Sequence, residues 1–159
     1  MLIKALELSK YIVSKCTEEN KPISNLQLQK ILYYIQYEFL KETDRVLFLD
    51  DIEAWRFGPV IPNIYYYFCG FGARKINTAF LENEYDSVVN SEIKEIFDRV
   101  IKEKSKLYPW DMVIETHKKN GAWDLTYNSG KGFKEIISIE CIKKEIENER
   151  RILNEKKYI

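Results

Sequence analysis

The run from residue 55 to residue 62, Trp-Arg-Phe-Gly-Pro-Val-Ile-Pro, restricts the backbone more than any other part of the sequence. Proline fixes φ and has no amide hydrogen, whereas glycine reaches backbone conformations that are closed to other residues. Gly58, Pro59 and Pro62 therefore exclude a helix interior and a central strand at this point. We expect a stiff corner that joins an extended segment, 52–57, to a short helix beginning near Pro62.

Aromatic residues stand on both sides of this corner: Trp55 and Phe57 before it, Tyr65 and Phe68 after it. A stiff corner holds such rings in one neighbourhood at a small entropic cost on binding. Arg56 lies among them, and tryptophan, tyrosine and arginine are enriched at interface hot spots. For any single ring, burial in the core is the simpler interpretation, because large rings mostly bury.

Hydrophobic periodicity predicts a predominantly α-helical α+β fold, with five or six helices around one core and a small two- or three-stranded sheet. The predicted helices cover residues 2–16, 24–39, 62–68, 90–101, 109–117 and 138–153. Ser24 and Gln27 have the spacing of a capping box, and Ser138 can cap the last helix. The candidate strands are 46–49, 52–57, 76–80 and 136–137, with the sheet built on 52–57, and residues 123–132 are expected to form a loop.

Length and charge predict one domain, 1–159, without a strong electrostatic field. Lys+Arg and Asp+Glu are equal at 25 each, so no net charge attracts nucleic acid or anionic lipid. The sequence contains no long apolar span, and Cys16, Cys69 and Cys141 lie far apart, which is typical of reduced thiols in the cytoplasm. With a single histidine and no paired cysteines, we expect neither a metal site nor a cofactor.

His117 invites an enzymatic interpretation, because histidine can exchange a proton near neutral pH. Asp111 lies six residues earlier, on a largely different face of the predicted helix, and the sequence has no nucleophile motif, phosphate loop or second histidine. Since His117 shares an apolar stripe with Val113 and Ile114, we favour a buried histidine that makes a fixed hydrogen bond. An enzyme of unknown class that uses His117 stays as an alternative.

Basic residues in the C-terminal third, among them Lys143 and Arg150, allow a nucleic-acid-binding interpretation. Glu145 and Glu149 interleave with them, often at the spacing of i,i+4 pairs, so we favour a solvated face whose charges neutralise one another. Lys30, which lies between apolar positions of the second predicted helix, is interpreted from its spacing as a surface charge.

Two motifs together resemble the Panacea domain, also called the SocA-like antitoxin domain. They are Ile23-Ser-Asn-Leu-Gln-Leu-Gln-Lys-Ile-Leu-Tyr-Tyr34 and Glu53-Ala-Trp-Arg-Phe-Gly-Pro-Val-Ile-Pro62, followed by Tyr65. Thr116 and His117, with Trp123 six positions after the histidine, resemble a third element of the family. The resemblance covers nearly the whole chain, and it assigns motif roles to Leu28, Lys30, Tyr33, Tyr34 and Trp123.

The resemblance implies a bacterial or phage antitoxin, with no catalysis, that neutralises a toxin encoded by a neighbouring gene through direct protein contact. The residues expected to bind this toxin are Trp55, Arg56, Gly58, Pro59, Tyr65 and His117. Some members of the family deliver the toxin to a cellular protease, so a proteolytic adaptor is one alternative. A nucleic-acid-binding regulator is another.

Overall fold

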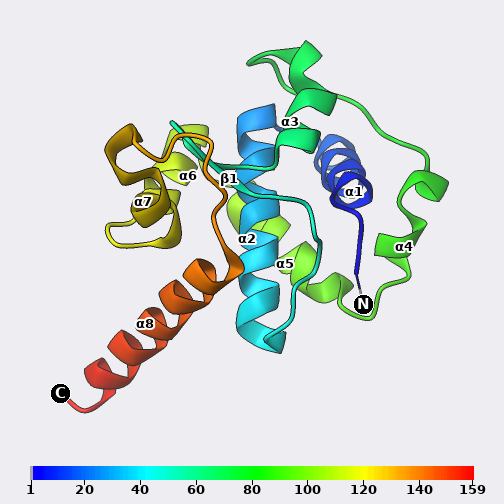
Figure 1. Cartoon of the computed structure of the whole chain (residues 1–159). Coiled ribbons are helices and arrows are strands. Elements are labelled where there is room, and N and C mark those ends of the chain that lie inside the picture. The colour runs from blue at the N-terminus through cyan, green and yellow to red at the C-terminus, as the bar shows by residue number, and fades with distance from the viewer. Residues whose placement is uncertain (1) are drawn as a thin grey trace.

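A computed structural model describes residues 2–159, and in it a long central helix, α2, is surrounded by the other elements (Figure 1). The helices are α1 (Ala5–Glu18), α2 (Asn25–Thr43), α3 (Pro62–Phe68), α4 (Asp86–Val89), α5 (Lys94–Lys104), α6 (Pro109–Thr116), α7 (Ala122–Tyr127) and α8 (Ile139–Lys157). The strands are β1 (Glu53–Trp55) and β2 (Gly58–Val60). The chain is therefore mainly helical with a small sheet, as predicted.

The start of α2 is fixed by the capping box that the sequence predicts. The Ser24 hydroxyl accepts a hydrogen bond from the Gln27 amide, and the Ser24 amide donates to Gln27 Oε1 at 2.9 Å. Both interactions satisfy amide groups that the first helical turn leaves without helical partners.

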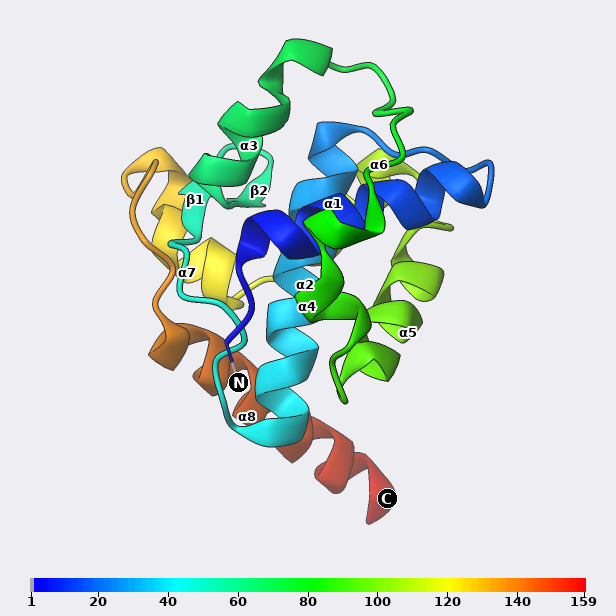
Figure 2. The same ribbon diagram turned by 90° about the vertical axis from the view of Figure 1, so that its right-hand side faces the viewer.

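The central helix is buried on nearly all sides rather than along one stripe. It packs against α1, α3, α5, α6, α8 and β2, and Figure 2 shows α1 crossing it. Apolar residues such as Leu28 and Phe39 are buried, and so are the polar residues Gln29, Lys30 and Gln36. A polar residue of α2 must therefore find its partners inside the protein.

The sheet is an antiparallel hairpin in which Ala54 lies opposite Pro59 and Trp55 lies opposite Gly58. Its turn consists of Arg56 and Phe57. The corner is thus a hairpin of three residue pairs, and its edge strand β2 can contain Pro59 because a proline has no amide hydrogen to donate.

A third segment flanks β1, as the candidate strand 136–137 predicts, but it makes a single bridge rather than a strand. Ala54 donates its amide to the Glu135 carbonyl and accepts from the Lys134 amide, both at 2.8 Å, and Glu53 bridges Ile136. The other candidate strands, 46–49 and 76–80, are wrong, because these residues run as irregular chain.

The described residues form eight helices, more than the five or six predicted. The two additional helices, α4 and α7, are only four and six residues long, too short to show a hydrophobic period. Residues 123–132 are therefore not simply a loop. The predicted start of α5 at residue 90 is also wrong, since this helix begins at Lys94 without a side-chain cap.

The last helix begins as predicted, with the Ser138 hydroxyl accepting from the Cys141 amide at 3.1 Å. Ile142 and Ile146 are buried, whereas the second half of α8 extends away from the other helices (Figure 1). No helix in residues 2–159 is long and apolar enough to cross a membrane.

Candidate functional site

Lys30 is the residue whose environment departs furthest from the sequence-based interpretation. Its side chain is 0% exposed, and its Nζ donates a hydrogen bond to the Pro59 carbonyl at 2.8 Å. No carboxylate within residues 2–159 forms an ion pair with it. Burial lowers the pKa of this amine to about 7, so the interpretation as a surface charge is wrong.

Gly58 lets the hairpin approach both α2 and α6. Its φ is +106°, a conformation that L-residues rarely adopt. A Cβ atom at this position would lie 2.6 Å from Thr116 Oγ1 and 3.0 Å from Lys30 Nζ. The glycine is therefore required by its backbone conformation and by the space around it.

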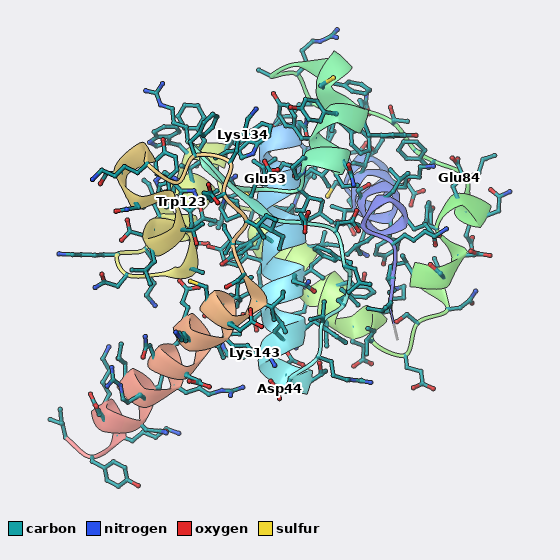
Figure 3. The ribbon with its side chains drawn as sticks, viewed as in Figure 1. Asp44, Glu53, Glu84, Trp123, Lys134 and Lys143 are labelled. Carbon is teal, nitrogen blue, oxygen red and sulfur yellow. The ribbon has the colours of Figure 1, made fainter. Side chains whose placement is uncertain are left out.

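The third sequence element assembles beside the hairpin. The Trp123 indole N–H donates to the Trp55 carbonyl at 2.8 Å, and the His117 ring stacks on Trp123 with centroids 3.6 Å apart and planes 3° apart. Figure 3 shows Trp123 on α7, on the side of α2 where the hairpin lies. Residues far apart in the sequence thus hold the β1 backbone in place.

The expectations for His117 itself are partly wrong. His117 follows α6 and is half-buried, and the face of α6 that is buried carries Met112, Val113 and Thr116 rather than Ile114, which is 59% exposed. Its Nε2 is buried without a hydrogen-bond partner among residues 2–159, so the expected fixed hydrogen bond is not formed at that atom. Burial, and secondarily the charge of Lys30, lower the pKa of the imidazole, which favours the neutral ring.

Exposed rings gather around the hairpin. We call Trp55, Phe57, Tyr65, Tyr66, Trp110 and Phe133 the aromatic face. Trp55 is half-buried and its ring centroid lies 4.9 Å from that of Tyr65, while Phe57 and Trp110, 5.7 Å apart, are 44% and 58% exposed. Such a concentration of exposed rings is typical of an interaction surface.

A pocket of about 450 Å³ opens within this face, between α2, the hairpin and the loop at Gly72. We call it the hairpin pocket. Trp55, Phe57, Tyr65 and Phe133 contribute aromatic walls, and the basic residues that line it are Lys30 and Arg56. Phe133 and Trp110 were not singled out from the sequence, because each is isolated from the motifs and reaches the hairpin only through the fold.

The motif tyrosines of α2 lie elsewhere. Tyr33, Tyr34 and Tyr37 line a second, polar pocket of about 360 Å³ together with four glutamates, two lysines and a threonine: Glu38, Glu115, Glu145, Glu149, Lys104, Lys118 and Thr116. The Tyr37 hydroxyl donates to Glu149 at 2.6 Å, and the Lys104 amine lies 4.1 Å from the centre of the Tyr34 ring. These internal contacts give the tyrosines a structural role between α2, α6 and α8.

Comparison with known protein families agrees with this arrangement. A model described as "Antitoxin SocA-like, Panacea domain" matches residues 28–124, which is more than half of the chain and includes the first motif from Leu28 onward, the second motif, the hairpin and Trp123. The chain belongs to the SocA-like Panacea domain family.

A curated relative supports the same assignment. "Antitoxin SocA" of Caulobacter vibrioides (strain NA1000 / CB15N) is 29% identical over 134 residues, which cover 79% of this chain and 71% of the relative. No solved structure matches the chain. The family and the relative are both named as antitoxins, which suggests an antitoxin role rather than catalysis for this Panacea domain and implies a cognate toxin as its partner.

Proposed function

We propose that this Panacea domain neutralises a toxin, encoded by a neighbouring gene, through direct binding at the aromatic face. The residues that carry this contact are those predicted from the sequence, Trp55, Arg56, Gly58, Pro59, Tyr65 and His117, in two different roles. Trp55, Arg56 and Tyr65 reach the surface, whereas Gly58 and Pro59 are buried and position them. His117 contributes through its stack on Trp123.

The observation that carries this proposal is the exposure of large rings on a rigid support. Tyr66 is 57% exposed and Phe57 44% exposed, and both belong to segments held by the hairpin, Pro62 and the Trp123 hydrogen bond. Rings that are fixed before binding lose little conformational entropy when a partner covers them. A partner that docks here would be neutralised sterically, because the antitoxin covers or distorts its active site.

Co-expression with the neighbouring open reading frame tests the proposal. We expect that gene product to be toxic alone and harmless together with the wild-type antitoxin. Trp55→Ala should abolish or strongly weaken rescue, because truncation of a hot-spot tryptophan typically costs about 2 kcal/mol or more of binding free energy. Tyr158→Ala is the matched control, since Tyr158 is a 92% exposed ring near the end of α8, far from the hairpin in sequence.

Direct binding of the purified proteins, measured by calorimetry, separates a binding defect from a folding defect. The Trp55→Ala variant should retain the circular dichroism spectrum of the wild type while losing toxin affinity. Full rescue by Trp55→Ala at wild-type expression levels would contradict the proposed docking surface.

A further inference from the structure

The hairpin pocket combines apolar walls with positive charge only. Leu26, Val60 and four rings supply apolar surface, and the basic residues are Arg56 and Lys30. Burial lowers the pKa of Lys30 to about 7, so its amine is only partly charged near neutral pH. No carboxylate from residues 2–159 lines the pocket. The Glu53 carboxylate does not line the pocket but accepts from the indole N–H of the wall residue Trp55 at 2.7 Å.

The positive groups at the pocket are not neutralised within the protein. Arg56 is exposed and makes no ion pair with any residue from 2 to 159, and its guanidinium rests 5.4 Å from the centre of the Phe57 ring. Lys134 stands at the rim, with its amine 5.4 Å from the Trp55 ring centre and 5.5 Å from that of Phe133 (Figure 3). Both cations are free to pair with a charge that a partner brings.

Lys30 adds positive potential from beneath the pocket wall. Its amine has three donors when charged, and the hydrogen bond to Pro59 uses one of them. Because this amine is enclosed by protein rather than water, its field reaches the pocket with little screening. When it is protonated, Lys30 therefore attracts a carboxylate at the pocket mouth together with Arg56 and Lys134.

The amides that line the pocket, by contrast, are already paired. Gln29 accepts from the Ile61 amide and donates to Asn25, and Asn25 donates to the Tyr65 carbonyl. Their oxygens and one N–H of each amide are therefore already used within the protein. The chemistry available to a partner is thus an apolar recess of about 450 Å³ beneath unpaired cations.

From this combination we propose that the hairpin pocket receives an aromatic side chain of the toxin that stands beside an aspartate or glutamate in the toxin sequence. The ring lies in the pocket against Trp55, Tyr65 and Phe133, and the acidic neighbour pairs with Arg56 and Lys134 at the rim. This inference rests on the proposed antitoxin function and adds the chemistry of the partner segment.

The ring geometry favours an aromatic occupant. Trp55 and Tyr65 meet edge to face, with planes 61° apart, and Trp55 and Phe133 meet at 60°. An additional ring can continue this arrangement, because aromatic pairs prefer edge-to-face or offset contacts. Charge complementarity then sets the position of the segment and favours an acidic partner over a basic one.

The test measures binding of two probes to the whole protein: indole-3-propionate and its neutral counterpart, indole-3-propionamide. Binding is measured by calorimetry and by changes in ¹⁵N NMR chemical shifts. We expect the acid to bind about fivefold more tightly than the amide, the gain expected from an ion pair at a partly exposed rim. Ala73→Trp places a large side chain at an exposed position that lines the pocket, and it should abolish binding of both probes. Arg56→Gln should reduce the affinity for the acid toward that for the amide.

Two control variants match these changes in size and charge. Ala79→Trp adds the same ring at an exposed position outside the pocket, and Arg45→Gln removes an arginine charge from an exposed residue just after α2. Both should retain wild-type probe binding. Thermal unfolding of all four variants identifies any that fail to fold.

The outcomes separate this inference from the proposed function. Absence of probe binding up to about 10 mM, which corresponds to about 2.7 kcal/mol of binding free energy, overturns the inference, and so does binding that Ala73→Trp leaves intact. Equal affinity for the acid and the amide overturns the part of the inference that places an aspartate or glutamate beside the aromatic residue of the toxin. If the inference fails in this way while Trp55→Ala still loses toxin rescue, the antitoxin proposal stands without it; if the probes bind as expected but Trp55→Ala rescues fully, the docking surface is wrong instead.

Discussion

The amine of Lys30 donates to the carbonyl of Pro59 at 2.8 Å and so fastens the edge strand of the hairpin to the central helix. The bond is made in the protein interior, where an ammonium loses its hydration and finds no carboxylate among the described residues. The same contact therefore positions the hairpin and, whenever the amine is protonated, destabilises the fold that contains it.

The stability of the protein should consequently depend on pH through Lys30. The folded-state pKa is lowered from 10.5 to about 7, so between these values the unfolded chain holds a proton that the folded chain does not. The free energy of unfolding then rises as pH rises, by about 1.4 kcal/mol per pH unit for one proton, and the contribution is constant below pH 7.

Lys30→Met isolates this effect, because methionine fills similar space and does not titrate. The difference in unfolding free energy, Lys30→Met minus wild type, should fall by about 2 kcal/mol between pH 7 and pH 9 in urea denaturation. Lys41→Met, at a half-exposed position of the same helix, should show no such trend. A pH-independent difference for Lys30→Met would mean that the amine keeps an ordinary pKa.

The hairpin should be intolerant of any side chain at residue 58. Gly58→Ala adds a Cβ that lies 2.6 Å from Thr116 Oγ1 in a backbone conformation with φ of +106°. We expect a loss of about 2 kcal/mol or more from strain and overpacking together, measured by urea denaturation. Gly130→Ala is the matched control, since Gly130 also has a positive φ, +96°, but the nearest atom to an added Cβ lies 3.8 Å away; it should lose less than Gly58→Ala because only backbone strain acts.

Helices whose ends are set by interactions between neighbouring residues can be predicted from the sequence, whereas helices held by distant residues cannot. The start of α2 is an example of the first kind, and α7 is an example of the second. Ser24 and Gln27 interact within one turn, so the capping box could be recognised from their spacing and is confirmed. The α7 helix has six residues, and its stability comes from Trp123, which is buried against Trp55 and His117. Those contacts join residues up to 68 positions apart, which no local pattern encodes.

In the candidate site, too, local features could be predicted from the sequence, whereas contacts between distant residues could not. The stiff corner was predicted from its glycine and prolines, which restrict the backbone wherever they occur. The burial of Lys30 could not be predicted from its spacing, because it follows from the number of elements that pack around α2. Trp110 and Phe133 joined the aromatic face for a similar reason, since α6 and the 133–134 segment bring them to the hairpin from distant positions.

Trp123 should stabilise the protein by two separable interactions. Trp123→Phe keeps a ring that can stack on His117 but removes the N–H that donates to the Trp55 carbonyl, so we expect a loss of about 0.5–1.5 kcal/mol for one part-buried hydrogen bond. Trp123→Leu also removes the stack, which should cost about 1 kcal/mol more. Equal unfolding midpoints for the two variants in urea would show that the stack contributes nothing.

Gln36 should be needed for the path of the chain after α2. Its side chain is 1% exposed; its amide group donates to the Phe48 carbonyl and its oxygen accepts from the Leu47 amide, both at 2.9 Å. Gln36→Leu preserves most of the volume but leaves one buried donor and one buried acceptor unpaired, each at about 1–3 kcal/mol. We therefore expect a loss of about 2–6 kcal/mol and a clear fall in the melting temperature.

Asn154→Leu supplies the control for this variant, because Asn154 is exposed on α8 and the same change from amide to leucine there should stay within about 0.5 kcal/mol. Hydrogen exchange of the Leu47 amide provides a second, local measurement. That amide should exchange slowly in the wild type and much faster in Gln36→Leu, since its only acceptor among residues 2–159 is Gln36 Oε1. Slow exchange in both proteins would show that the segment 47–48 is held by packing alone.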